Sequence, residues 1–199
     1  MVRCKIYIEG GGSNNKSLDT LFRQGWNQFF AKAGIKIRVV RGASRQATFK
    51  DFAIAIKNAG KDELPLLLLD SECAVDPSHT VWQHLKRHDS MNKPPNARDD
   101  QAYLMVELME TWLLCDAGAL EQHFGKNFKA NKLPKWPDFE AIDKPKIQDT
   151  IKTVTSGQYA KGEVSFKLLA LTDPEKVTEK CPNARRLIDF LSTNATTPV

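Results

Sequence analysis

The sequence predicts an α/β protein with a mostly parallel sheet flanked by helices and with a C-terminal helical elaboration. Three short apolar runs alternate with two segments whose apolar residues recur at helical spacing. A chain that alternates strand and helix makes right-handed crossovers, so the strands are expected to run parallel. The chain has 199 residues, of which 41% are hydrophobic, enough for one domain with a sizeable core.

The apolar pattern orders the elements of the first half. The first run stops at glycines, and Gly34 is placed to end the helix that Ser17 opens. The third run, Pro65 to Asp70, is fully apolar until its aspartate, as expected of a strand buried on both faces. The predicted strands are residues 3–8, 35–40 and 65–70, and the predicted helices are residues 17–34 and 49–59.

The second half is less regular. The polar, proline-containing residues 91–99 predict a loop. The stretch 101–125 is apolar enough to be buried, and its first half fits strand or helix equally well. Lysines and prolines make residues 126–145 irregular. Helices are predicted around residues 79–88, 146–154, 165–171 and 184–191, and a disordered tail at residues 192–199. We expect one domain over residues 1–199, with a core of about 1–125 and an elaboration of about 126–190.

Composition narrows the cellular setting. The formal net charge of +5 suits a polyanionic partner without requiring one. The four cysteines, which form no CxxC pair, indicate neither a zinc site nor a redox motif: Cys4, Cys73, Cys115 and Cys181. The sequence has no signal-peptide pattern and no apolar run of roughly 18 residues. A cytoplasmic protein with reduced thiols and no membrane contact is expected.

The glycines after the first strand resemble part of a nucleotide-binding P-loop. Residues 10–17, GGGSNNKS, match the pattern G-x-x-x-x-G-K-[ST] except that Asn15 stands where the second glycine belongs. Asparagine tolerates a positive φ, but glycine is needed where phosphate approaches closely. This interpretation also leaves Glu9 and Glu72 without a role, so a P-loop nucleotide enzyme is a further alternative only.

Carboxylates follow two of the predicted strands. Glu9 ends the first strand, Asp70 ends the third, and Glu72 lies two residues later, on the same face as Asp70 if the chain stays extended. Ligand sites in parallel sheets form at the carboxyl ends of strands. Such acidic clusters bind Mg²⁺ or Mn²⁺, which support phosphodiester hydrolysis or transfer. Asp70 and Glu72 are expected to hold the metal, and Glu9 to bind it or to act as general base.

Further residues are candidates for the same site. Glu110 lies inside an apolar segment and is a fourth candidate metal ligand, or else an exposed helix residue. Lys161 is either a catalytic cation or a turn lysine. The candidate phosphate and nucleic-acid contacts are the glycines Gly10 and Gly11, the arginines after the second strand, Arg41 and Arg45, and the loop lysines Lys129 and Lys132. A solvated loop is the alternative for the lysines.

Three histidines, His79, His84 and His88, fall within ten residues. His84 and His88 lie one helical turn apart, which would suit a metal. Without a third ligand in the sequence nearby, surface histidines are the simpler interpretation, and their role stays open.

The motifs IYIEGGGS and LLLLDSE resemble the Toprim domain of topoisomerases, primases and overcoming-lysogenization-type nucleases. The resemblance implies a Rossmann-like fold in which Glu9, Asp70 and Glu72 hold the catalytic metal. This sequence departs from the Toprim pattern at Glu72, where the second acid is usually aspartate.

Most of the chain is similar to an uncharacterised bacterial family of small Toprim-like proteins, related to RloB-like proteins and often encoded beside AAA- or ABC-type ATPases in defence islands. The similarity runs through WQHLKRHD, DDQAYLMVELMETWLLCD and YAKGEVSFKLLALTDPEKV. It implies a Mg²⁺- or Mn²⁺-dependent nuclease that acts on DNA or RNA, with tRNA among the candidates, as the effector of a phage-defence system with a partner ATPase. A homodimer is compatible with it. The alternative is a non-catalytic subunit that binds nucleic acid or the ATPase.

Overall fold

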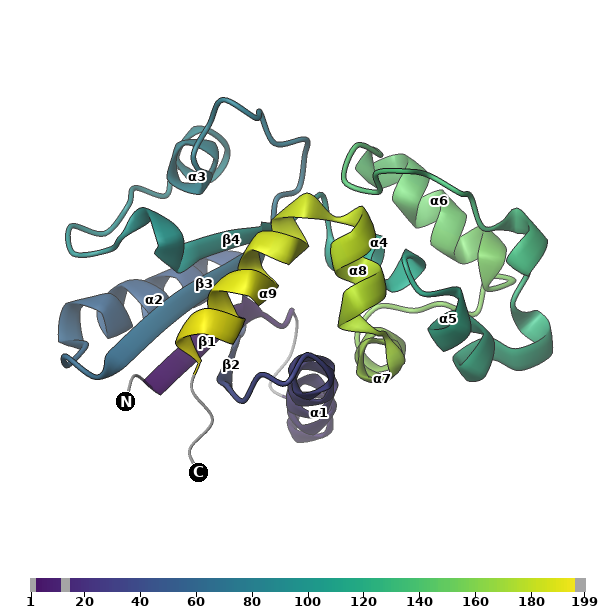
Figure 1. Ribbon diagram of the computed structural model, residues 1–199, viewed down its shortest axis with the longest axis horizontal. Coiled ribbons are helices and arrows are strands. Elements are labelled where there is room, and N and C mark those ends of the chain that lie inside the picture. Colours follow the sequence, from purple (N-terminus) through teal and green to yellow (C-terminus); the bar gives the residue numbers. More distant parts are fainter. Residues whose placement is uncertain (1–2, 12–14, 196–199) are drawn as a thin grey trace.

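An alternation of strands and helices builds a parallel sheet in the computed structural model (Figure 1), which describes residues 3–11 and 15–195. Within these residues the sheet has four strands: β1 (Arg3–Glu9), β2 (Arg38–Gly42), β3 (Glu63–Asp70) and β4 (Ala102–Met105). Their order is β2-β1-β3-β4, and each neighbouring pair is parallel. The predicted α/β class and parallel sheet are confirmed. Because β2 and β3 lie on opposite sides of β1, the strand order reverses between β1 and β3.

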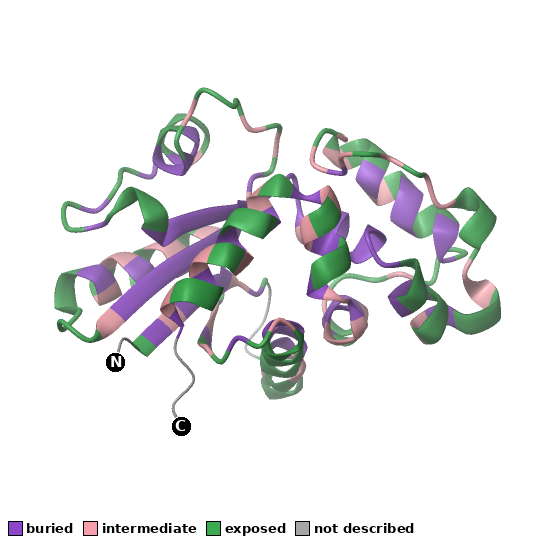
Figure 2. Ribbon diagram, in the orientation of Figure 1, coloured by how far each residue is buried: buried purple, intermediate pink, exposed green. Residues whose placement is uncertain are grey.

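Helices cover both faces of the sheet. On one face α1 (Lys16–Lys32) and α9 (Pro182–Asn194) pack against alternate strand residues such as Ile6 and Leu66. On the other, α2 (Arg45–Asn58) and α3 (Val81–Asp89) cover Leu67 and Leu69. Figure 2 shows the strands buried between these helices. The apolar run of β3 is therefore explained by burial on both faces.

Local side-chain caps set where the first helices begin. The side chain of Asn15 accepts hydrogen bonds from the backbone N–H groups of Ser17 and Leu18, which starts α1. Thr80 and Gln83 form a reciprocal capping box that starts α3. These caps satisfy N–H groups that have no partner within the helix.

The remaining helices lie largely beside the sheet (Figure 1). They are α4 (Met109–Leu114), α5 (Ala117–Phe124), α6 (Lys144–Val154), α7 (Glu163–Leu171) and α8 (Pro174–Lys180), with 3₁₀ turns at Asp99–Gln101, Gly125–Asn127 and Ala130–Lys132. Helix α7 packs along α1, and α9 returns to β4. The C-terminal elaboration therefore shares the main hydrophobic core with the sheet.

Several element predictions need correction. The second strand is Arg38–Gly42 rather than residues 35–40, because Ile35 is buried beside the end of α1, before the strand begins. The ambiguous stretch 101–125 divides into β4, α4 and α5, and α8 was not predicted. The tail was predicted to be disordered from residue 192, but α9 continues through Asn194 and Ala195 is buried. The tail's last residues, 196–199, lie outside the described residues.

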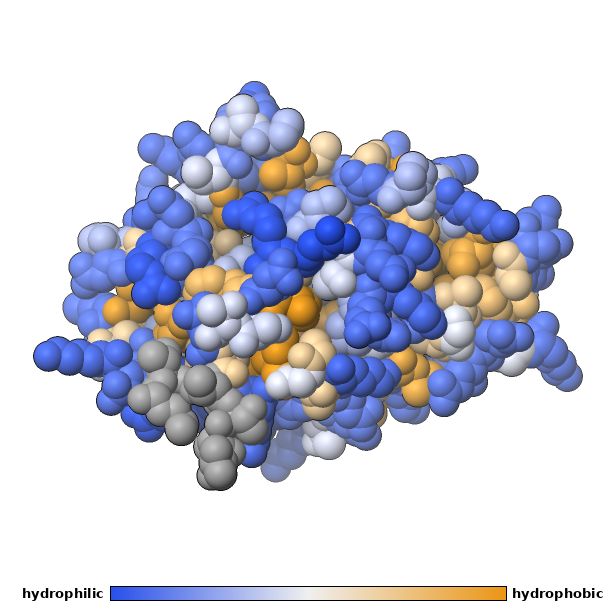
Figure 3. Space-filling model, viewed as in Figure 1, coloured by the Kyte–Doolittle hydropathy of each residue, from blue (hydrophilic) through white to orange (hydrophobic). Residues whose placement is uncertain are grey.

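The exterior is largely hydrophilic on the face that Figure 3 shows. Among the described residues no helix combines the length and apolar character needed to cross a bilayer.

Candidate functional site

Acidic side chains gather at the carboxyl ends of three adjacent strands. Glu9 ends β1, Asp70 ends the neighbouring β3, and Glu107 follows β4 by two residues. The gap between β1 and β3 is where the strand order reverses, the usual place for a ligand site in an open parallel sheet. The structure therefore brings Glu9 and Asp70 to one edge of the sheet, as predicted from the strand ends. We call this edge, with Glu9, Asp70 and Glu107, the acidic edge.

Asp70 is the most strongly perturbed acid of this edge. Its Oδ1 accepts a hydrogen bond from the backbone N–H of Met109, with N and O 2.9 Å apart. Burial raises the pKa of Asp70 to about 8, with further contributions from three neighbouring carboxylates: Glu110, Glu72 and Glu9. The folded protein thus resists a negative charge here unless a cation accompanies it.

Glu9 is partly buried with incomplete hydrogen bonding. Its Oε2 is buried and accepts no hydrogen bond from any described residue. The nearest cation is Arg45, whose Nη1 lies 3.8 Å from this oxygen. Burial raises the pKa of Glu9, and the charge of Arg45 opposes that rise. An orphaned, buried carboxylate oxygen needs another partner, and a cation is a suitable one.

Arg45 links the ends of three elements. It donates two hydrogen bonds of 2.7 Å to the carboxylate of Asp89, at the end of α3, and one of 2.6 Å to the carbonyl of Asp70. This bidentate pair fixes the guanidinium beside Glu9. Arg45 therefore lies at the predicted edge, but its donors are largely used within the protein.

Glu72 does not continue β3 in an extended conformation, so the predicted arrangement of Asp70 and Glu72 on one strand face is wrong. Its φ is 65°, in the left-handed region, and its backbone N–H donates to the carbonyl of Glu107. Its exposed carboxylate pairs with the ammonium of Lys144, in the first turn of α6. A non-glycine residue in this conformation costs free energy and often marks a functional turn.

Glu107 is an acid of this site that was not predicted from the sequence. It is buried, and its Oε2 accepts a 2.6 Å hydrogen bond from the backbone N–H of Lys144. The sequence carries the same signal as at Asp70, an apolar run that ends in an acid, but the neighbouring apolar residues of α4 obscured where the strand stops.

Glu110 is buried at the start of α4, as the metal-ligand interpretation required, rather than exposed on a helix surface. The hydroxyl of Tyr159 donates a 2.8 Å hydrogen bond to Oε1, and the ammonium of Lys161 lies 3.5 Å from the same atom. Lys161 is exposed, so its ammonium lies where this acidic edge meets solvent. Burial, followed by the charge of Glu110, raises the pKa of Tyr159.

The glycine loop is organised around Arg41. The Arg41 side chain is largely buried, pairs with Asp19 at 2.6 Å and donates to the carbonyls of Gly10 and Gly11. A Cβ on Gly10 would lie 2.3 Å from Cγ of Arg41, and Gly11 has a φ of +59°. Both glycines have local structural causes, and Arg41 is engaged within the protein.

Residues 12–14 of the P-loop pattern lie outside the described residues. The side chain of Asn15 already accepts from two N–H groups at the start of α1. A P-loop would direct such groups at phosphate.

Lys129 and Lys132 are exposed in the irregular segment between α5 and α6, away from the sheet in Figure 1. The neighbouring rings of Phe128 and Trp136 pack against the main core, and the ring centroid of Trp136 is 5.2 Å from that of Phe139. Rings held this way favour the solvated loop over a base-stacking surface.

In this structure the described carboxylates are too far apart to bind one metal ion together. In the part of the chain that the structure describes, no three of them place ligand oxygens within 4.8 Å of one another. Instead, three of these acids each lie beside a cation: Glu72 beside Lys144, Glu110 beside Lys161, and Glu9 beside Arg45. The all-oxygen donor set fits Mg²⁺ or Mn²⁺ in kind, but Glu72 would have to leave Lys144 to join Asp70 and Glu9.

Comparison with known proteins places this chain in a family without assigning a reaction. The model of the family described as a domain of unknown function, DUF4276, matches residues 8–192. Neither a curated protein nor a solved structure matches the chain. Because this match spans most of the chain, the chain belongs to the DUF4276 family.

Proposed function

We propose that this protein is a Mg²⁺- or Mn²⁺-dependent nuclease that hydrolyses phosphodiester bonds in DNA or RNA. The carrying observation is the convergence of acids after three adjacent parallel strands, where burial raises the pKa of Asp70 to about 8 and leaves Oε2 of Glu9 without a hydrogen bond from the described residues. A bound cation stabilises the charged form of such buried acids more than that of exposed ones. A Toprim-like relationship, inferred from the sequence motifs, supports the same proposal.

In this proposal some residues bind the metal ion and others neutralise the charge of the phosphate. Asp70, Glu9 and Glu72 would hold the cation, with Glu110 and Glu107 as further donors. A divalent cation here supplies a Lewis acid for a phosphoryl oxygen. Lys161 and Arg45, the cations beside Glu110 and Glu9, are positioned to offset phosphate charge at the same edge. From the sequence resemblance we also propose that a partner ATPase controls the reaction in phage defence.

The test compares cleavage of plasmid DNA, single-stranded DNA and tRNA with Mg²⁺ or Mn²⁺, with and without the partner ATPase. Glu9→Gln and Asp70→Asn should each lower the rate at least about 100-fold, since each removes a charge from the proposed site. Glu63→Gln is the matched control, because Glu63 begins β3 at the opposite end of the sheet and pairs with Lys5. Cleavage that survives both site variants would reject this assignment. No cleavage under any condition would favour the non-catalytic subunit.

A further inference from the structure

A second group of metal-ligating side chains lies next to the acidic edge and has no role in the proposed hydrolysis. Cys73, His84 and His88 each place one ligand atom within 4.8 Å of the others. The Sγ of Cys73 is 3.5 Å from Nδ1 and 3.7 Å from Nε2 of His88, and the ring centroids of His84 and His88 are 4.6 Å apart. The His88 ring therefore has to turn for one of its nitrogens to share a metal with the sulfur. Tetrahedral Zn²⁺ separates a sulfur and a nitrogen ligand by about 3.6 Å, given its usual bond lengths.

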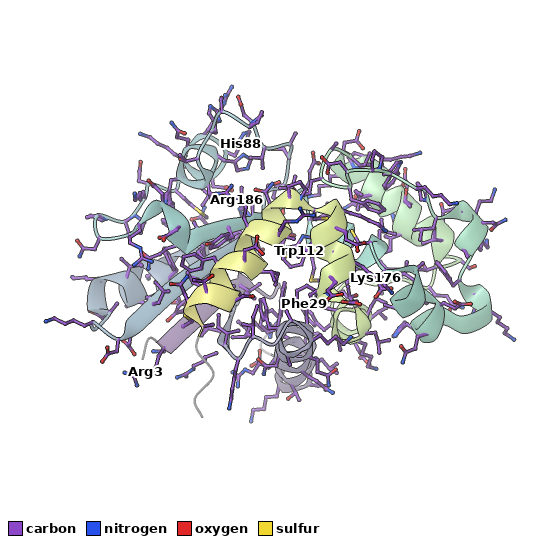
Figure 4. All side chains as sticks on the ribbon, in the orientation of Figure 1. Arg3, Phe29, His88, Trp112, Lys176 and Arg186 are labelled. Carbon is purple, nitrogen blue, oxygen red and sulfur yellow. The ribbon has the colours of Figure 1, made fainter. Side chains whose placement is uncertain are left out.

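The backbone builds this cluster from two segments. His84 and His88 are one turn apart on α3, so their side chains share a helix face. His88 extends from α3 at the upper margin of Figure 4. The turn at Glu72, with its φ of 65°, directs the chain so that Cys73 lies against this face. The third ligand is not apparent from the sequence because Cys73 lies 15 residues from His88.

A hydrogen bond fixes the protonation of one ligand. Nε2 of buried His84 lies 3.0 Å from the carbonyl oxygen of Ser71. A carbonyl only accepts, so Nε2 carries the proton, and in the neutral ring Nδ1 holds the lone pair. Metal-bound histidines commonly donate their other N–H to a carbonyl in this way, which fixes the ring.

We propose that Cys73, His84 and His88 bind Zn²⁺, or Co²⁺ in its place, as a site separate from the carboxylates. The thiolate and imidazole donors suit these metals, whereas the all-oxygen edge suits Mg²⁺ or Mn²⁺. The Cys73 thiol releases its proton to solvent as the sulfur–metal bond forms. Three protein ligands leave a fourth position for water. Binding ties the loop of residues 71–73 to α3 and thereby fixes Glu72.

The test is a Co²⁺ titration of the purified, reduced full-length protein, followed by absorbance. One equivalent should give a thiolate-to-cobalt charge-transfer band and tetrahedral d–d bands, and Zn²⁺ but not excess Mg²⁺ should remove them. Cys73→Ser should abolish the charge-transfer band. His88→Ala should weaken binding by more than the roughly 10- to 100-fold that loss of an outer-shell partner costs.

Matched controls separate this site from the proposed active site. His79→Ala alters a histidine of the same region that pairs with Asp76 instead, and should leave the bands unchanged. Asp70→Asn should also keep them, whether or not the protein proves to be a nuclease. Circular dichroism checks folding, which should survive because Cys73 is only partly buried and His88 is exposed. A wild-type spectrum without a thiolate band, or a band that persists in Cys73→Ser, would overturn the proposal.

Discussion

The carboxylate of Asp70 accepts one hydrogen bond, from the backbone N–H of Met109. The charges that act on it come from three other carboxylates and from one lysine, Lys161. Glu9, on the neighbouring strand, keeps a buried oxygen without a hydrogen bond from the described residues. Arg45 does not neutralise either acid fully, because its hydrogen bonds go to Asp89 and to a carbonyl. At the scale of single residues, a negative charge on these strand-end carboxyl groups therefore costs stability unless a cation binds beside them.

The pH dependence of stability follows from Asp70. Its pKa is raised from 3.8 to about 8, so between these values the folded state holds a proton that the unfolded state has lost. Stability from this group is present at low pH and is lost as the pH rises toward 8. In EDTA, the Tm of Asp70→Asn relative to wild type should therefore increase from pH 6 to pH 8, by at least about 3 °C.

Thermal unfolding of both proteins at the two pH values measures this difference. Taking the Tm of the variant minus that of wild type at each pH removes the contribution of groups that titrate alike in both proteins. Asparagine keeps the Oδ1 acceptor for Met109, so the variant tests charge rather than the hydrogen bond. A relative Tm that stays constant with pH would show that Asp70 titrates normally.

At the scale of elements, the first turn of α6 closes over the acidic edge. The ammonium of Lys144 pairs with Glu72, and its backbone N–H binds Glu107. These contacts join the start of α6 to the turn after β3 and to the segment after β4. Lys144 thus competes directly with any cation that uses Glu72.

Replacing Lys144 should strengthen metal binding at the proposed active site. Lys144→Ala frees the Glu72 carboxylate but keeps the backbone N–H that binds Glu107. An exposed ion pair contributes up to about 1 kcal/mol, so Mn²⁺ affinity should rise about 2- to 5-fold. Calorimetric titration measures it, with Lys146→Ala, two residues along the same helix, as the matched control. Equal affinities for the two variants would mean that Glu72 is not a ligand.

Sequence patterns predicted the elements with clear periodicity and the two acids that end buried strands. They placed the second strand too early, because the β-branched run from Ile35 to Val40 does not show which of its residues pair with β1. They missed α8, which is short and charged. The pairing of Arg45 with Asp89, across 44 residues, depends on tertiary packing and has no local signal.

At the scale of the whole molecule, the sheet and the C-terminal helices are joined by aromatic packing. Phe29 and Trp112, labelled in Figure 4, stack with ring centroids 5.6 Å apart, and Phe22 meets Phe166 of α7 edge to face at 5.1 Å. Helices α1 and α7 approach closely because Gly25 has no side chain: its Cβ would lie 2.6 Å from the carbonyl oxygen of Phe166. The acidic edge is assembled from both parts, so it depends on this junction.

Gly25→Ala should therefore destabilise the protein, although alanine favours an isolated helix by about 1 kcal/mol. The new methyl group meets backbone rather than a flexible side chain, and overpacking of this kind costs about 1–3 kcal/mol. We expect the Tm to fall by at least about 2 °C, in a single transition seen alike by circular dichroism and tryptophan fluorescence.

Gly60→Ala is the matched control, since no described atom lies within 4 Å of its Cβ position, and it should leave the Tm within about 1 °C. If Gly25→Ala instead gave two separate transitions, the C-terminal helices would fold independently of the sheet. An unchanged Tm would mean that α1 and α7 can move apart at no cost, and that the junction does not fix the edge where Glu110 and Lys161 meet Asp70.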